Sequence, residues 1–566
     1  MKKLALAIFV VCVLQLSAVV INIPDDQPTI QAGLNIAAEN DTVLVHPGVY
    51  FENLVWPATS EIKLFGINQE ECIIDGNNLG NVIRINNISG ITKIDGFTIQ
   101  NGNANGTGPY YSNGGGIYCV DVTLQLSNLF IVDNTALEKG GGIYCRTSDL
   151  SLINILISNN ISNIDEWCEG GGGIYCCVQS NLYLDNVSLE NNTAVSSGGG
   201  LFCKGTTLNI HNSEFINNHS LYDPGFPNQF GGGGMFCYSG SSFVENVTFS
   251  NNTAISNGGG FGLNFSDAFM NKVYVTDNSA LASGGGVYMT QSISELTNLL
   301  VTNNSTEGSG GGLSINGTWS EYPLLTNVTI ANNCSIMGGG ICAMLGGPRL
   351  TNCILWNNEP EEIYGIDHSN GSPVIAITYS DIEGGEAGIN FGNGTVYWMI
   401  GNIDDDPLFL GMGDHPYSLN FDSPCIDAGT LSFVPGYELP GYDIVGNTRI
   451  FGTTVDMGAY EWQETLINNE ELVIRNYDLS NYPNPFNPST IIEFSIQNDS
   501  KIELLIFNIK GQKIKTLANN EFNKGDHSVI WYGNDDSEKF VSSGVYFYKL
   551  NVNGKTEAMK KCLLLK

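Results

Sequence analysis

Aromatic residues recur at one position of a repeated glycine word, and their spacing would let them form a stacking surface. The word GGGIYC begins at residue 114, and the same word or a close variant begins at residues 140, 171, 198 and 232. Its fifth letter is always aromatic, and the five residues are Tyr118, Tyr144, Tyr175, Phe202 and Phe236. Flat rings of this kind can pack against sugar rings, with nearby polar groups fixing the orientation. Arg146 and Lys204 each stand two residues after a ring and could supply such groups.

The glycine triplets themselves recur at a nearly constant spacing. Their last glycines fall at 116, 142, 173, 200, 234, 260, 286, 312 and 340, which are separations of 26 to 34 residues. Self-similarity at a fixed period is typical of a solenoid, whose units bury a continuous core by stacking. The units alternate apolar and polar residues, as in TTLNIHNSEFINN, and show no helical period. Short strands separated by turns at this period predict a parallel β-helix.

Counting from the last glycine of each triplet places the aromatic rings on the outer face of a strand. The first residue after that glycine is apolar in every unit, and the third is cysteine in five units: Cys119, Cys145, Cys176, Cys203 and Cys237. Side chains alternate across a strand, so these two positions share the inner face and the ring between them points outwards. We expect the cysteines to form a ladder of buried thiols, although the spacing of neighbouring strands also permits disulfides.

The outward rings have two interpretations. In the first, they form an exposed platform for sugar rings, flanked on the same face by Arg146 and Lys204. In the second, they stack on one another beneath a long loop, such as NIDEWCEG before Gly173 or FPNQFG before Gly234. The five rings and the two basic residues are therefore candidate ligand-binding residues, while the sequence identifies no catalytic residue.

Each unit also contains two asparagines that are six residues apart. The later one is present in nine units: Asn134, Asn160, Asn192, Asn218, Asn252, Asn278, Asn304, Asn333 and Asn358. The earlier one is replaced once, by Lys272, and is otherwise Asn128, Asn154, Asn186, Asn212, Asn246, Asn298, Asn327 and Asn352. Asparagine tolerates a left-handed bend, and stacked amides can hydrogen-bond along a ladder. We expect both columns to be structural.

These repeats resemble a known family. The GGGIY and FINN or FSNN words are similar to the repeats of chlamydial polymorphic outer-membrane proteins, within the pectate-lyase-like superfamily of right-handed β-helices. The stretch PTIQAGLNIAAENDTVLVHPGVYFEN resembles the start of many such proteins. That resemblance implies a short helix that closes the open end of the solenoid, with Ile30, Leu34 and Ala37 on one face and Thr29 as its N-cap.

Both ends of the chain carry export signals. Residues 1–19, with two lysines before an apolar run, predict a secretory signal peptide. The motifs NYPNPFNPST, GVYFYKL and KKCLLLK near the other end closely resemble the C-terminal sorting domain of the type IX secretion system. The resemblance implies passage through the periplasm of a diderm bacterium to the cell surface or the medium, with the secretion machinery as a partner. No stretch of the mature chain is long and apolar enough to predict a transmembrane span.

The predicted chain is all-β, with a right-handed parallel β-helix followed by a small antiparallel β-sandwich. The expected segments are the signal peptide at 1–19, the β-helix at 20–400, a cap or anchor-associated module at 401–463, a linker at 464–478 and the sorting domain at 479–566. DDDPLF, SPCIDAG and DMGAYE resemble the module that follows such β-helices. There Asp443, Arg449 and Asp456 could form charge-assisted pairs.

Cofactors and nucleic acid are not expected. Asp404, Asp405 and Asp406 offer a calcium site as an alternative, but no EF-hand or other ligand spacing accompanies them. Residues 1–470 carry 11 basic and 46 acidic residues, which disfavours binding to nucleic acid or anionic membranes.

Three functions remain open. The eight basic residues between positions 22 and 400 are scattered, with no aspartate cluster recurring beside them, so the base and Ca²⁺ site of a uronate lyase are not evident. The sequence favours an exported glycan-binding or adhesin-like protein, with a polysaccharide or cell-surface glycan as its partner. The alternatives are a polysaccharide lyase or glycoside hydrolase, and a passive surface or stalk protein.

Overall fold

The chain forms two compact units, Met1–Gln463 and Glu464–Lys566. The structure, a computed structural model, describes residues 18–463 and 479–564 apart from gaps at 107–111, 164–168, 222–230, 318–321, 434–436, 438, 485, 497–498, 509–511 and 554. Most of the predicted signal peptide and all of the predicted linker lie outside the described residues.

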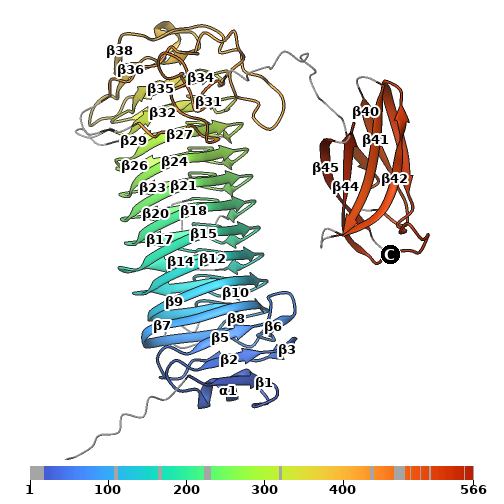
Figure 1. The fold of residues 1–566 in the computed structure, drawn as a ribbon. Helices are drawn as coiled ribbons and strands as arrows, with labels where there is room; N and C mark the ends of the chain where they lie inside the picture. Colours follow the sequence, from blue (N-terminus) through green and yellow to red (C-terminus); the bar gives the residue numbers. More distant parts are fainter. Residues whose placement is uncertain are drawn as a thin grey trace, which may run out of the picture. The chain divides into compact units, whose positions relative to one another are not determined.

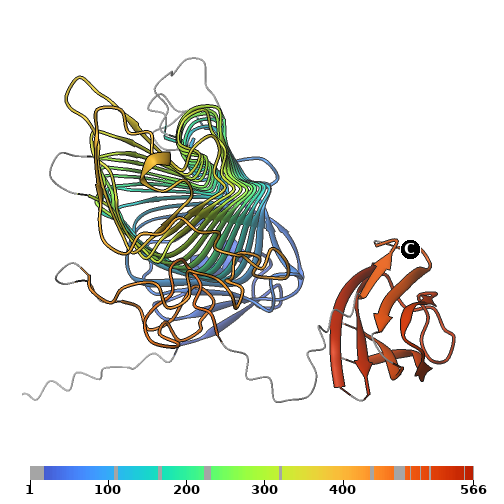
Figure 2. The same cartoon turned by 90° about the horizontal axis from the view of Figure 1, so that it is seen from above.

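The first unit is a parallel β-helix, as predicted. One sheet of 30 strands runs through it, and successive coils pair in parallel. Figure 1 shows the coils stacked from the N-terminal helix to an irregular end region, and in Figure 2 the strands of successive coils lie over one another. The interior of the stack holds one continuous core of buried aliphatic, aromatic and cysteine side chains.

A typical coil contains three strands. The first strands are β11 (Ile143–Arg146), β14 (Ile174–Cys177), β17 (Leu201–Lys204), β20 (Met235–Tyr238), β23 (Phe261–Asn264), β26 (Val287–Thr290), β29 (Leu313–Asn316), β32 (Ile341–Met344) and β35 (Ile363–Ile366). The second strands are β12 (Asp149–Ser158), β15 (Asn181–Glu190), β18 (Thr207–Ile216), β21 (Ser241–Ser250), β24 (Asp267–Thr276) and β27 (Glu295–Thr302). In two earlier coils the first and second strands are continuous, as β7 (Ile83–Gln100) and β9 (Ile117–Val132).

The third strands are short and form a separate sheet of eight. They are β8 (Asn103–Ala104), β10 (Thr135–Ala136), β13 (Ile161–Ser162), β16 (Thr193–Ala194), β19 (His219–Ser220), β22 (Thr253–Ala254), β25 (Ser279–Ala280) and β28 (Ser305–Thr306). Towards the C-terminal end the second strand of each coil is divided into two, which gives the pairs β30 (Leu324–Thr326) and β31 (Thr329–Ala331), β33 (Arg349–Thr351) and β34 (Ile354–Trp356), and β36 (Val374–Thr378) and β37 (Asp381–Ile382). The short 3-10 helix η1 (Glu386–Gly388) and β38 (Thr395–Trp398) follow.

The predicted register of the first strands is confirmed. Ile143 pairs with Ile174 and Cys145 pairs with Cys176, and all four side chains are buried in the interior. The five cysteines of the repeat are free thiols in successive coils. Their stacking in the core matches the predicted ladder of buried thiols.

Two features explain the glycine triplet. The first glycine adopts a left-handed conformation, with φ of 68° at Gly140, which costs glycine little. The second glycine lies where the coils approach most closely, because a Cβ on Gly141 would come within 2.5 Å of the Gly172 carbonyl oxygen. A larger residue at the second position would push adjacent coils apart, and one at the first position would clash with the following strand of its own coil.

The later asparagine of each unit forms a buried inner ladder. The Asn218 side-chain amide donates to Asn252 Oδ1 at 3.0 Å and to the Leu189 carbonyl at 2.8 Å, while its backbone N–H also donates to Asn252 Oδ1. The same pattern repeats from coil to coil. The ladder ends at Asn358, which donates to the buried carboxyl of Glu362. The predicted structural role of this column is confirmed.

The earlier asparagine lies at a left-handed corner within the second strand and forms an outer ladder. In the middle coils the amides bond to one another, as Asn246 does to Asn212 Oδ1 at 2.8 Å. In the last coils they are buried and donate to backbone carbonyls of residues 401–463, the cap module. Asn298 donates to Tyr442, Asn327 to Asp456 and Asn352 to Thr430, each at 2.9 to 3.0 Å. The outer ladder therefore also holds the cap module against the coils.

The cap module contains a buried charge cluster whose pairing differs from the prediction. Arg449 forms its ion pair with Glu461, at 3.7 Å, and not with Asp443 or Asp456. The two aspartates accept backbone N–H groups instead, for example from Asn447 and Trp462. The prediction of direct pairs was wrong because these carboxylates are used to close backbone turns.

The N-terminal end of the solenoid is closed as predicted. Strands β1 (Val20–Ile23), β2 (Thr42–Val45), β3 (Gly48–Phe51), β4 (Leu54–Val55), β5 (Lys63–Gly66) and β6 (Cys72–Asp75) form the first coils, and α1 (Ile30–Ile36) lies over them. Thr29 is the N-cap and accepts a hydrogen bond from the Ala32 N–H at 3.1 Å. Ile30, Leu34 and Ala37 are buried in the core of the coils.

The second unit is a small antiparallel sandwich. One sheet contains β39 (Leu479–Tyr482), β40 (Thr490–Ile496) and β43 (Gly525–Trp531), and the other contains β42 (Lys513–Phe522), β41 (Ser500–Asn508), β44 (Gly544–Val552) and β45 (Lys555–Leu564). Its own core includes Phe486, Phe494, Trp531 and Tyr548. The predicted β-sandwich is therefore present.

Candidate functional site

The structure brings the five predicted aromatic residues together as one continuous stack, the ring column. The rings of Tyr118, Tyr144, Tyr175, Phe202 and Phe236 follow one another with centroids 5.3 to 5.8 Å apart and interplanar angles of 2 to 20°. Arg84 closes one end, with its guanidinium 3.9 Å from the Tyr118 ring centroid. At the other end a Cβ on Gly262 would lie 2.6 Å from the Phe236 ring, so this glycine makes room for the last ring.

The ring column points away from the interior of the solenoid but is not exposed. Its members are between 0 and 4% exposed and form a small core of their own. The segment that leads into each glycine triplet crosses directly over the strand: a Cβ on Gly140 would lie 2.9 Å from Tyr144 Cα. The prediction of an exposed platform at these residues was therefore wrong, and the alternative of rings stacked under a covering segment describes the column.

Charged side chains complete the cover over the ring column. Glu169 is buried and pairs with Lys139 at 2.7 Å and with Lys204, and the Tyr175 hydroxyl donates to it at 2.5 Å. Burial alone would raise the pKa of Glu169, but the two ammonium groups and the hydrogen bonds lower that pKa below its usual value. Arg146 lies in the same cross-strand row as Lys204, with Cys177 between them. Lys204 is exposed and Arg146 is half-buried.

A second set of rings, on the outer face of the second strands, is open to solvent. Tyr183, Phe243 and Phe269 occupy one cross-strand row, in which Asn209 stands between the first two. His211 belongs to the adjacent outward row and fills the gap, with ring centroids 5.7 Å from Tyr183 and 5.5 Å from Phe243. Tyr183 and Phe269 are 36 and 38% exposed, and the other two rings are half-buried. We call these four residues the ring row.

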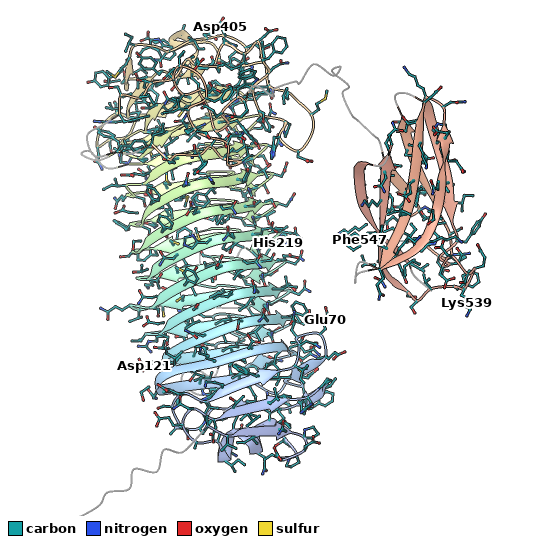
Figure 3. All side chains as sticks on the ribbon, viewed as in Figure 1. Glu70, Asp121, His219, Asp405, Lys539 and Phe547 are labelled. Atoms are coloured by element: carbon teal, nitrogen blue, oxygen red, sulfur yellow. The ribbon has the colours of Figure 1, made fainter. Side chains whose placement is uncertain are left out.

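The ring row was not identified from the sequence, although a signal for it exists. Tyr183, Phe243 and Phe269 each stand three residues before the corner position of the outer ladder, which is Asn186, Asn246 and Lys272 in those coils. Aligning the units on that asparagine, and not on the glycine triplet, would have revealed the row. Side chains leave the coils outwards in such columns along the whole solenoid (Figure 3).

A polar cleft adjoins the ring row where the coils meet the cap module. It has a volume of about 370 Å³ and is lined by His211, Asn212, Glu245, Asn246, Lys272, Ile444 and Val445. His211 Nδ1 lies 3.9 Å from Glu245 Oε2, and the Lys272 ammonium lies 5.4 Å from the Tyr442 ring centroid. Carboxylate, amide, imidazole and ammonium groups thus stand beside exposed rings.

This arrangement suits recognition of a molecule with both apolar faces and hydroxyl groups. Ring faces bind apolar surface, while the amide and charged groups can donate and accept hydrogen bonds at fixed positions. Among the described residues, no group of three His, Cys, Asp or Glu side chains gathers as a metal site. Two aspartates of the predicted calcium alternative accept backbone N–H groups, Asp404 from Gly384 at 2.9 Å and Asp406 from Leu408.

Comparison with known families identifies the second unit. Residues 480–564 match the family described as the secretion system C-terminal sorting domain. This segment is a type IX sorting domain. The NPFNP motif of the sorting domain contributes Phe486 to the core, where its ring centroid lies 5.3 Å from that of Trp531. A chain with this sorting domain is a secreted or cell-surface protein. In the described part of the chain, no helix is both long and apolar enough to cross a membrane.

Comparison of the remaining chain gives less. No curated protein is detectably similar to it. A solved structure, the catalytic unit of a thermostable GH87 alpha-1,3-glucanase from Streptomyces thermodiastaticus strain HF3-3, matches with a TM-score of 0.27 and 13% identity over 65% of this chain and 65% of that chain. The sorting domain therefore indicates where the protein is delivered, whereas the activity of the protein depends on the solenoid.

Proposed function

We propose that this secreted or cell-surface protein binds glycans along the outer face of β15, β18, β21 and β24. The observation that carries the proposal is the ring row, because it places four rings in contact on an open surface. Neighbouring strands are about 4.8 Å apart, so the row extends over three spacings, or about 14 Å. An extended saccharide can lie along a surface of that length.

The ring row differs from a packing cluster in its exposure. Its rings are partly tilted, by 41° between Tyr183 and His211, and partly stacked, within 7° of parallel between Phe243 and Phe269. Tyr183 and Phe269 are more than one-third exposed, so part of their ring surface is available to a ligand, which a closed stack does not offer. Exposed aromatic residues beside convergent polar groups are typical of binding sites.

The experiment is glycan binding by the purified full chain and by two variants. Replacing Phe243 and Phe269 together by alanine should weaken binding about 10- to 50-fold, because each ring contributes on the order of 1 kcal/mol of stacking. The matched control is Phe265→Ala, which removes a ring that is 54% exposed but lies outside the row. The control should bind as the unchanged protein does, and both variants should remain folded, with the melting temperature lowered by a few degrees at most.

Two results would overturn the proposal. Equal binding by the double variant and the unchanged protein would remove the ring row from recognition. Absence of binding to any member of a broad glycan array would favour the stalk alternative. Release of reducing ends or unsaturated uronates by the unchanged protein, lost in the double variant, would instead extend the site to an enzyme.

A further inference from the structure

A cavity lies at the far end of the face that carries the ring row. The cross-strand row of Phe269 continues through Glu295 and Leu324 to Arg349, and then to Ala376 and Tyr397. Arg349 is three strands beyond Phe269, which is about 14 Å. A ligand that follows the face away from the ring row therefore reaches this cavity.

The walls of the cavity combine apolar surface with a line of hydroxyl groups. Its volume is about 500 Å³, and it is closed on one side by Ser432, Phe433 and Tyr437 of the cap module. Leu324, Met399 and the rings of Tyr397 and Phe433 supply apolar surface. Thr326, Thr351 and Thr378 stand in register on three successive strands and supply the hydroxyls. A volume of this size is typical of a small-molecule site.

Arg349 gives the cavity its charge. Its side chain is exposed, and in the described part of the chain no carboxylate forms an ion pair with it. Its guanidinium makes a cation–π contact with the Tyr322 ring, whose centroid lies 5.4 Å away. Residues 1–470 carry 46 acidic and only 11 basic residues, so an arginine that lines a cavity and forms no ion pair with a described carboxylate is unusual. A guanidinium presents a planar fork that matches anionic oxygens.

We propose that this cavity binds one saccharide unit that carries an anionic substituent, at the end of an otherwise neutral chain held by the ring row. The inference rests on the proposed glycan binding and names its ligand more closely. Glu245 beside the ring row and Glu295 between the row and the cavity would repel acidic units there. Lys272, the cation beside the ring row, shares its cleft with Glu245, whereas the described lining of the cavity contains Arg349 and no carboxylate, so we place the acidic unit at the Arg349 end and neutral units along the ring row.

The first measurement tests the cavity without relying on the ring row. Glucose, glucuronate and glucose 6-sulfate are titrated into the full chain and into Arg349→Gln, with binding followed by calorimetry. We expect the unchanged protein to prefer one or both acidic sugars over glucose by about 10- to 100-fold, since a hydrogen bond to a charged group contributes more than a neutral one. The two acidic probes separate a carboxylate from a sulfate ester as the recognised group.

The variants decide the result. Arg349→Gln should abolish the preference and leave glucose binding unchanged, and Arg349→Lys should retain part of it. Lys63→Gln, which removes a cation from β5, outside both the ring row and the cavity, should leave the preference intact. Equal binding of the three sugars by the unchanged protein, or a preference that survives Arg349→Gln, would overturn the inference.

The second measurement separates this inference from the proposed function. Oligosaccharides with and without a terminal acidic unit are compared in the Phe243→Ala, Phe269→Ala double variant. Loss of affinity for both, with the acidic preference retained, is expected if both sites act. If the double variant binds both oligosaccharides with unchanged affinity, the ring row takes no part in binding, while the inference about the cavity stands. If Arg349→Gln loses the preference for the acidic oligosaccharide and the double variant keeps it, the cavity is the source of that preference.

Discussion

Two sets of aromatic side chains point away from the interior of the same solenoid, yet only one of them reaches solvent. The ring column on the first strands is almost fully buried, whereas Tyr183 and Phe269 of the ring row are more than one-third exposed. Side chains alternate between the two faces in both sets of strands, so alternation does not explain the difference in exposure. The difference arises because the chain crosses over the first strands on its way into each glycine triplet. Strand alternation therefore fixes the direction of a side chain, and the neighbouring segment decides its exposure.

The largest expected effect separates the two sets of rings by stability. Phe202→Ala removes a fully buried ring from the middle of the column and should cost about 3–5 kcal/mol of unfolding free energy, through lost burial and the cavity left behind. Phe243→Ala, in the half-exposed ring row, should cost on the order of 1 kcal/mol or less. Denaturant unfolding of the two variants provides the comparison. Equal losses would mean that the rings do not differ in burial in solution.

A smaller effect separates the two asparagine ladders in the same way. Asn218→Ala should cost about 1–3 kcal/mol, because in a buried position the Leu189 carbonyl loses its amide donor and the Asn192 backbone N–H loses Asn218 Oδ1 as its acceptor. The matched control is Asn212→Ala, which lies in the same coil on the exposed outer ladder. It should lower the free energy of unfolding by less, since water can replace the hydrogen bonds of Asn212. Melting temperatures would test the order. A larger loss for Asn212 would contradict it.

The smallest effect is a pH response of opposite sign in two regions, one at Glu169 and the other at the buried carboxyl groups of Glu461 and Asp456. The pKa of Glu169 is lowered, so its contribution to stability is present above the unfolded pKa and is lost as pH falls through the folded value. Burial raises the pKa of Glu461 to about 8 and that of Asp456 to about 6. Their contribution is present below the unfolded pKa and is lost as pH rises through about 6 to 8.

Amide hydrogen exchange would resolve this response by region. Protection near β14, which carries Tyr175, should decrease at acid pH, whereas protection around Asp456 and Trp462 should decrease from pH 6 to 8 after correction for the intrinsic exchange rate. Glu461→Gln should flatten the second change and leave the first as it is. Parallel pH profiles in both regions would contradict the assignment.

The sequence predicts the contacts that repeat in this molecule, but not those that depend on segments of variable length or on the cap module. The inner positions of the first strands and the inner ladder could be predicted because every unit must satisfy the same contacts with the next. The exposure of Tyr144 could not be predicted, since it depends on the path of a segment whose length varies between units. The cap module has no period, and the pairing of Arg449 with Glu461 depends on backbone turns that close around Asp443 and Asp456.

The ring row could have been found with a different alignment. Tyr183, Phe243 and Phe269 each stand three residues before the outer-ladder position, but they stand ten, nine and nine residues after the last glycine of the triplet, because the turn between the first and second strands is one residue longer in the coil of Tyr183. The chemical use of the ring row could not be inferred from that position, since Asn209 and Glu295 occupy it in other coils. The site is a local departure from the repeat, which is expected where function is added to a scaffold.

The inner ladder also has a consequence for how this protein can change over generations. Each middle coil offers the next one the same bonds, and the triplets that end at 234, 260, 286 and 312 are separated by 26 residues each. Duplication or loss of one such segment would therefore regenerate a matching junction without altering either end. Solenoid length is free to vary by whole coils, and with it the distance between the N-terminal helix and the cap module.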